Sequence, residues 1–193
     1  MPIFGFPRTR SREVPRPISC PAGRIAAVLP VILLVMGIWG IGGVGSRAWC
    51  AQIVDDLGRR VELTGPAKRI IALYGGYNEI LGAMGMEERL VGRTKADVLP
   101  PSILSRPSIG THMRPNVEMI LGLRPDLAIQ LAGRKEALAI VQQIQDQGVP
   151  VAVFNPGSFA DLFSVLRRLG VLTGGVDQAE GLLDSLGARL CLL

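Results

Sequence analysis

The chain has 193 residues, enough for one domain with a hydrophobic core, and a net charge of +5. All of this charge lies in residues 1–51, which hold six arginines and one glutamate and leave 15 basic and 15 acidic residues for the rest. The later chain has no basic stripe interleaved with aromatic residues, so composition argues against nucleic acid as a partner.

Residues 1–51 have the layout of an export signal. A basic segment precedes the apolar run IAAVLPVILLVMGIWGIGGVG at residues 25–45, and small and polar residues follow it. The charge bias predicts that the N-terminus stays cytoplasmic and the rest is exported. Since about 20 apolar residues can span a bilayer, both a cleaved signal peptide and an N-terminal membrane anchor remain open. We therefore expect a periplasmic protein, or one tethered to the outer face of the cytoplasmic membrane.

Two local motifs in this region match known patterns only in part. Arg47 and Trp49 stand where a lipoprotein signal would need an aliphatic and a small residue before Cys50, which argues against lipidation. GIGGVG, at residues 40–45, matches a dinucleotide-binding pattern but lies inside the apolar run and lacks the strand–turn–helix context. Three scattered cysteines form no disulfide framework or thiolate metal site.

From residue 52 onward, short strands alternate with helices. QIVDDLGRRVEL predicts two strands around a turn, in which Asp55 and Asp56 most simply make surface pairs with Arg59 or Arg60. RIIAL, RLVGR, DLAIQ and VPVAVF are the next predicted strands. Helices are expected to begin at Asn78, at Asn116, near residue 135 and at Ser158, the last one broken near residues 174–175 and ending near Leu190. This order predicts an α/β fold with a mainly parallel sheet flanked by helices.

Ligands of such sheets collect at the loops that follow the carboxyl ends of the strands. These loops are YGGYNE, LAGR, NPGS and the segment GTHMRPN. The ligand-binding candidates in them are Tyr74, Tyr77, Asn78, His112, Arg114 and Arg134, with Arg93 nearby. Tyrosines offer flat faces and arginines bind carboxylates, although packing of a turn, a surface histidine and solvated charges are plain alternatives.

No residue set supports catalysis. His112 is the only histidine, and neither a G-x-S-x-G motif nor a phosphate-binding lysine loop is present. We therefore expect a binding protein without a cofactor or metal of its own, not an enzyme.

DDLGRRVEL…AKRIIAL, YNEILGAMGMEERLVGRT and PNVEMILGLRPDLAIQ together resemble the periplasmic substrate-binding proteins of ABC importers for ferric siderophores, heme and vitamin B12. The resemblance covers residues 53–190 in order and spacing. It implies two α/β lobes joined by a long helix, with a metal chelate held between the lobes. It also implies that a glutamate of each lobe docks on the membrane permease, and Glu118 matches that of the first lobe.

The resemblance divides the chain into a signal or anchor at 1–51, an N-terminal lobe at 52–157, and the end of that lobe with the linking helix at 158–193. A second lobe has no counterpart, which fits a fragment, a frameshifted product or a short protein. YGGYNE replaces a Ser/Pro-rich turn, so the ligand need not be a typical siderophore. A membrane-anchored module that only docks a partner is the alternative, and an oxidoreductase is disfavoured because cluster-ligating cysteines are lacking.

Overall fold

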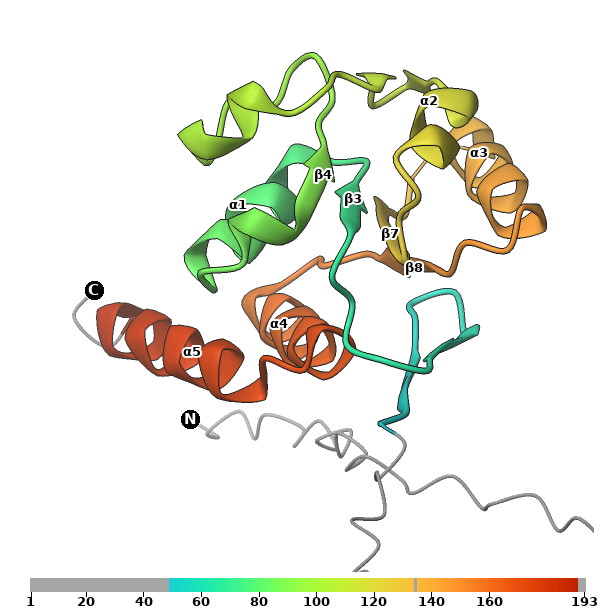
Figure 1. Cartoon of the computed structure of the whole chain (residues 1–193). Helices are drawn as coiled ribbons and strands as arrows, with labels where there is room; N and C mark the ends of the chain where they lie inside the picture. The colour runs from blue at the N-terminus through green and yellow to red at the C-terminus, as the bar shows by residue number, and fades with distance from the viewer. Residues whose placement is uncertain (1–48, 134, 191–193) are drawn as a thin grey trace, which may run out of the picture.

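The computed structural model describes residues 49–133 and 135–190. At its centre lies a parallel sheet with the strand order β4-β3-β7-β8 (Figure 1). Its strands are β3 (Ile70–Ala72), β4 (Leu90–Gly92), β7 (Leu127–Leu131) and β8 (Val151–Phe154). Because all four strands run the same way, their carboxyl ends meet at one edge of the sheet.

Helices cover both faces of the sheet, as the buried strands require. One face packs against α1 (Gly75–Ala83), α4 (Phe159–Thr173) and α5 (Val176–Leu190). The other packs against α2 (Val117–Gly122) and α3 (Lys135–Asp146). Alternation along β8 shows the division, since Phe154 belongs to the first core and Val153 to the second. The expected α/β fold with a mainly parallel sheet flanked by helices is confirmed.

A hairpin of β1 (Ala51–Val54) and β2 (Arg60–Leu63) precedes the sheet, as expected. Its turn is more than a surface turn, because the Asp55 side chain is fully buried. That carboxylate accepts hydrogen bonds from the Arg59 guanidinium at 2.7 Å and from the backbone N–H of Val153 at 3.3 Å. Asp56 pairs with Arg168 of α4 at 2.6 Å. The expected pair of Asp55 with Arg59 is confirmed, but its surface location was wrong, since the Asp55 carboxylate is buried. Asp56 pairs with Arg168 and not with Arg59 or Arg60, so both acids attach the hairpin to the sheet layer.

The helix ends mostly follow the local sequence. Asn116 caps α2 by accepting a hydrogen bond from the Met119 N–H at 3.0 Å, and Ser158 caps α4 through the Asp161 N–H at 3.2 Å. Gly174 separates α4 from α5 with φ of +69°, a conformation that glycine adopts without strain. The prediction that a helix begins at Asn78 was wrong, because α1 begins at Gly75.

An irregular segment links β4 to α2. It contains the short 3-10 helix η2 (Pro101–Ser105) and the small antiparallel pair β5 (Gly110–Thr111) and β6 (Arg114–Pro115). A further 3-10 turn, η1 (Glu87–Arg89), precedes β4. Arg93 and Ser108 form a parallel bridge, which places this segment beside the end of β4.

Among the described residues, no helix is long and apolar enough to cross a membrane. The apolar run at 25–45, the GIGGVG motif and Arg134 lie outside the described residues. The division of the chain at residues 51 and 157 stays a prediction.

Candidate functional site

The carboxyl edge of the sheet is the candidate functional site. The loops that follow β3, β4, β7 and β8 start there, at residues 73, 93, 132 and 155. We call the surface they form, with the β5–β6 turn, the carboxyl edge. It carries the exposed side chains of Tyr74, Lys95, His112, Arg114 and Lys135. This edge thus carries the cationic side chains of Lys95, Arg114 and Lys135 beside the exposed ring of Tyr74.

The two tyrosines of the first loop differ in exposure. Tyr74 is 42 % exposed, whereas Tyr77 is only 2 % exposed. Their rings meet edge to face with centroids 6.0 Å apart, and Tyr77 contacts Phe154 in the same way at 5.9 Å. The Tyr77 hydroxyl donates to the Phe154 carbonyl at 3.3 Å. Tyr77 thus supports Tyr74 from beneath, and only Tyr74 presents a ring to solvent.

Burial is the main cause that raises the pKa of Tyr77 above its usual value, and the negative charge of Asp56 adds to it. The phenol is therefore neutral at physiological pH and acts as a hydrogen-bond donor.

Asn78 is fully buried beneath the same loop. Its amide donates to Asp97 Oδ2 at 2.9 Å, and the same oxygen accepts from the Thr94 N–H at 2.8 Å. The side chain of Asn78 therefore holds the loop after β4 and is not presented at the surface. Its contact with a ligand stays a prediction, as it does for Tyr77.

His112 and Arg114 are brought together by the β5–β6 turn, where both are exposed. Gly110 opens this turn with φ of +102°, and a Cβ there would lie 2.9 Å from the Arg114 carbonyl oxygen. Glycine is thus required for the turn to close. Arg93 is half-buried and donates to the Thr94 carbonyl at 3.1 Å, so it shapes its loop from within.

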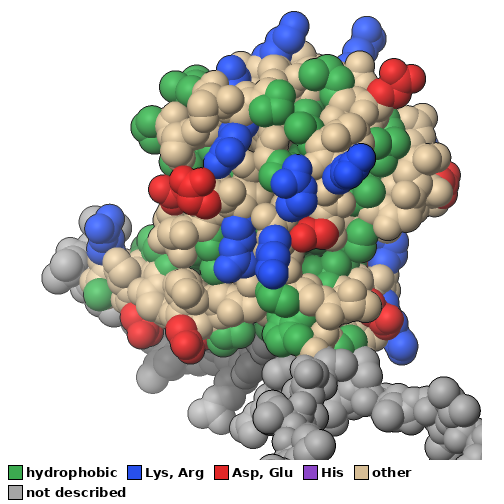
Figure 2. All heavy atoms as spheres, in the orientation of Figure 1, with side chains coloured by type: hydrophobic (Ala, Val, Ile, Leu, Met, Phe, Trp, Pro, Cys, Tyr) green, Lys and Arg blue, Asp and Glu red, His purple; other side chains and the backbone are tan. Residues whose placement is uncertain are grey.

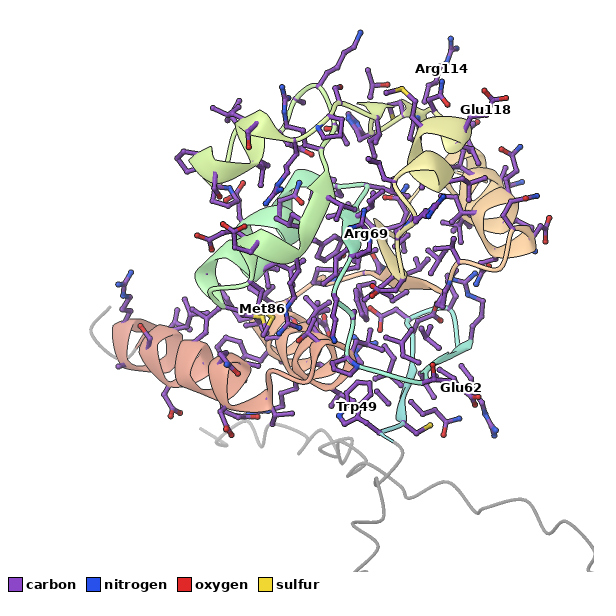
Figure 3. All side chains as sticks on the ribbon, in the orientation of Figure 1. Trp49, Glu62, Arg69, Met86, Arg114 and Glu118 are labelled. Atoms are coloured by element: carbon purple, nitrogen blue, oxygen red, sulfur yellow. The ribbon has the colours of Figure 1, made fainter. Side chains whose placement is uncertain are left out.

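Glu118 lies in the first turn of α2, one element beyond this hairpin. Its side chain is exposed, and in Figure 3 both Arg114 and Glu118 point outward from the body of the protein. The negative charge is favourable at a helix N-terminus. The carboxylate is therefore available to a partner without disturbing the core.

Lys and Arg side chains also gather in the middle of the face shown in Figure 2, where Arg69 lies in the matching view of Figure 3. Arg69 precedes β3, so this face is at the amino ends of the strands and not at the carboxyl edge. Its guanidinium donates to the Leu123 carbonyl at 2.6 Å and to the Arg124 carbonyl at 3.0 Å. Arg69 thus caps the end of α2, a structural role that explains its position.

Sequence reasoning missed Asp97 and Lys95. Both lie in TKADV directly after the predicted strand RLVGR, and that position was the available signal. Within residues 49–133 and 135–190, no three His, Cys, Asp or Glu side chains come together as a metal-binding group. A separate apolar hollow lies between the start of α4 and the end of α5, lined by Phe159, Leu162, Phe163, Leu186, Arg189 and Leu190.

Comparisons with known proteins indicate the family of this chain. The model of the family described as "Periplasmic binding protein" matches residues 70–190. The Bacillus subtilis protein named "Uncharacterized ABC transporter substrate-binding lipoprotein YvrC" is 28% identical over 140 residues, covering 71% of this chain and 44% of that protein. A vitamin B12-binding protein of Vibrio cholerae is 39% identical over 64 residues, covering 33% of this chain and 23% of the relative.

Solved structures agree in architecture. A periplasmic heme binding protein from Pseudomonas aeruginosa aligns with a TM-score of 0.57 at 28% identity, over 63% of this chain and 44% of that one. The periplasmic heme-binding protein RhuT from Roseiflexus sp. RS-1, in apo form, aligns with a TM-score of 0.57 at 32% identity, over 66% and 49%. This chain spans less than half of the length of each of these four proteins.

Proposed function

Because this chain belongs to the periplasmic binding protein family, we propose that it acts as a substrate-binding component of an ABC importer. It captures a metal chelate of the heme, corrinoid or ferric-siderophore class outside the cytoplasmic membrane and delivers it to the permease. The protein is not an enzyme in this role. Export by the N-terminal segment fits the proposal, since the protein would have to bind the chelate outside the cytoplasmic membrane.

The observation that carries the proposal is the composition of the carboxyl edge. Tyr74 offers an exposed ring to a flat or apolar part of a ligand, Lys95 and Arg114 offer positive charge, and His112 offers an exposed imidazole. Heme and many siderophores combine an apolar or aromatic part with carboxylates, which arginine and lysine bind. The names of relatives that bind heme and vitamin B12 support the same ligand class.

Titration of the purified protein with hemin, cyanocobalamin and ferrichrome tests this proposal. We expect the protein to bind one of these ligands. Tyr74→Ala should weaken that binding about tenfold or more, whereas Tyr74→Phe should keep it, because stacking uses the ring and not the hydroxyl. Leu57→Ala is a matched control. Leu57 is 43 % exposed, close to the 42 % of Tyr74, but it lies in the β1–β2 turn. No binding of any of the three ligands would overturn the ligand class.

Delivery requires a contact with the permease, and we assign Glu118 to it. The carboxylate is exposed and lies one element beyond the ligand loops. A rim charge of this kind mainly governs the association rate and its salt dependence.

A further inference from the structure

The buried carboxylate of Asp97 joins two of the loops that form the carboxyl edge. Asp97 is only 6 % exposed, and its Oδ2 accepts from Asn78 of α1 and from the Thr94 N–H of its own loop, at 2.9 Å and 2.8 Å. One hydrogen bond shapes the loop after β4, and the other attaches that loop to the start of α1. Asp97 thus connects segments 19 residues apart in the chain.

Gly75 sets the spacing between these two segments. It is the first residue of α1 and follows the exposed Tyr74 directly. A Cβ at Gly75 would lie 2.7 Å from Asp97 Oδ1, closer than real Cβ contacts allow. The Asp97 carboxylate can therefore reach Asn78 only because residue 75 has no side chain.

The same loop is attached on its other side to the hairpin that carries His112 and Arg114. The Lys95 N–H donates to the Gly110 carbonyl at 2.7 Å, and the Asn116 N–H donates to the Ile109 carbonyl at 2.7 Å. Hydrogen bonds therefore attach this loop to α1 through Asp97 and to the start of the hairpin through the Lys95 N–H, while the Asn116 N–H closes the base of the hairpin.

Unpartnered polar atoms are concentrated in the same region. Five buried side-chain atoms of the described residues lack a hydrogen-bond partner, and they belong to Asn78, Arg93, Thr94, Arg106 and Ser108. Such groups are costly to bury and persist where a function or a neighbouring group needs them. Asn78 and Thr94, which hold two of these atoms, are also the two residues that bond to Asp97.

We propose that Asp97 is a positioning residue that, with Asn78 and Gly75, fixes the distance between Tyr74 and the His112–Arg114 hairpin. This role rests on the proposed function, because these two groups are the ligand contacts it would hold apart. Rigid support of contact residues lowers the ordering cost of binding. A residue that only stabilised its own turn would affect the Thr94 amide alone, which makes the two roles distinguishable.

Amide hydrogen exchange on the full chain, resolved by NMR, tests the positioning role without a ligand. Asp97→Ala should raise exchange about tenfold at the Lys95 and Asn116 amides as well as at Thr94, because the whole loop loses its attachment to α1. Asp97→Asn keeps an oxygen acceptor in the same place, so its exchange should stay within about twofold of the parent. Unchanged exchange at Lys95 and Asn116 in Asp97→Ala would overturn the proposal.

Gly75→Ala attacks the same contact from the opposite side and should reproduce the pattern of Asp97→Ala. Gly181→Ala is its matched control, because a Cβ at this glycine of α5 meets nothing within 4 Å. If Asp97→Ala fails to fold, Gly75→Ala decides the question in the same way. Failure of both variants to fold would show a general structural role and overturn the proposal.

A hemin titration of the same variants adds the functional readout. Asp97→Ala should weaken hemin binding about tenfold and Asp97→Asn should restore it, as expected for a group that prepares the contacts and does not make them. Tight hemin binding by Asp97→Ala would overturn the positioning role. If the parent binds no hemin, the heme form of the proposed function fails, while the exchange pattern still decides the role of Asp97.

Discussion

Glu118→Ala should weaken docking on the permease while leaving folding nearly intact. Glu118 is the second residue of α2, is exposed, and acts on its own helix only as a favourable charge near the N-terminus. Loss of this charge costs about 0.3–1 kcal/mol of the free energy of unfolding. The closed core around the nearby Ile120 does not depend on it.

Glu136→Ala is a closely matched control. Glu136 is likewise the second residue of its helix, α3, and is exposed. Both variants lose one negative charge and about the same 0.3–1 kcal/mol of stability, measured by urea unfolding. Any difference between them in docking therefore reflects the place of the charge and not its effect on the helix.

The docking effect is small but measurable. An exposed ion pair contributes about 0.2–1 kcal/mol, so removal of one partner should lower the association constant by about 1.4- to 5-fold. Glu118→Lys replaces attraction with repulsion and should about double the free-energy change. The effect should appear in the association rate and shrink as salt rises, because screening acts on exposed charges.

The assay is the association of the protein with its importer in proteoliposomes at low and at physiological salt, followed by substrate uptake. Glu118→Ala should bind more slowly and transport less, while Glu136→Ala should match the parent. Equal docking of the two variants would refute the assignment. A loss of ligand affinity in Glu118→Ala would instead place the residue in the binding surface.

Three further predictions concern the scaffold and its ionisation. Asp55→Ala should lower the free energy of unfolding in urea by about 3–5 kcal/mol, because Arg59 and the Val153 N–H lose a buried acceptor. A loss below about 1 kcal/mol would contradict the role of Asp55 in attaching the hairpin to the sheet. Gly170→Ala should lower the free energy of unfolding by about 1–3 kcal/mol in the same assay, since its Cβ would lie 2.8 Å from the Ala179 Cβ where α4 meets α5. A stabilised variant would show that the two helices can move apart without cost. The raised pKa of Tyr77 means that the folded state holds its proton more strongly than the unfolded state, so this stabilisation is complete below pH ~10 and is lost as pH rises above it. An absorbance titration should therefore show one tyrosine that ionises late, and this late step should vanish in Tyr77→Phe; its persistence would contradict the assignment.

The local sequence predicted the elements of this fold well because local forces determine them. The apolar run RIIAL could satisfy its burial only as an inner strand, and Asn116 could cap a helix with its own side chain. The break near Gly174 followed in the same way from the conformational freedom of glycine.

Contacts between distant segments could not be predicted in this way. Asn78 was expected to begin a helix, but its amide bonds to Asp97, 19 residues later. The helix begins at Gly75 instead, and Tyr74 precedes it with extended backbone and no side-chain cap. Asp55 was expected at the surface, yet it accepts from the Val153 N–H, 98 residues away. Asn78 bonds to a distant residue in place of a cap, and Asp55 adds a distant bond to its local ones with Leu57 and Arg59. A single sequence does not show which distant partner the fold will supply.

Asn116 supports both the hairpin proposed to bind the ligand and the helix that carries Glu118. The Asn116 N–H donates to the Ile109 carbonyl at the base of the His112–Arg114 hairpin, while the Asn116 side chain caps the helix that presents Glu118. A displacement of the hairpin would therefore act, through Asn116, on the start of α2. By thermodynamic linkage, any change that ligand binding makes in docking is matched by an equal change that docking makes in ligand affinity. If the proposed delivery is coupled to ligand binding, we expect Asn116→Ala to reduce the effect of ligand on docking, because Asn116 bonds to both the hairpin and α2.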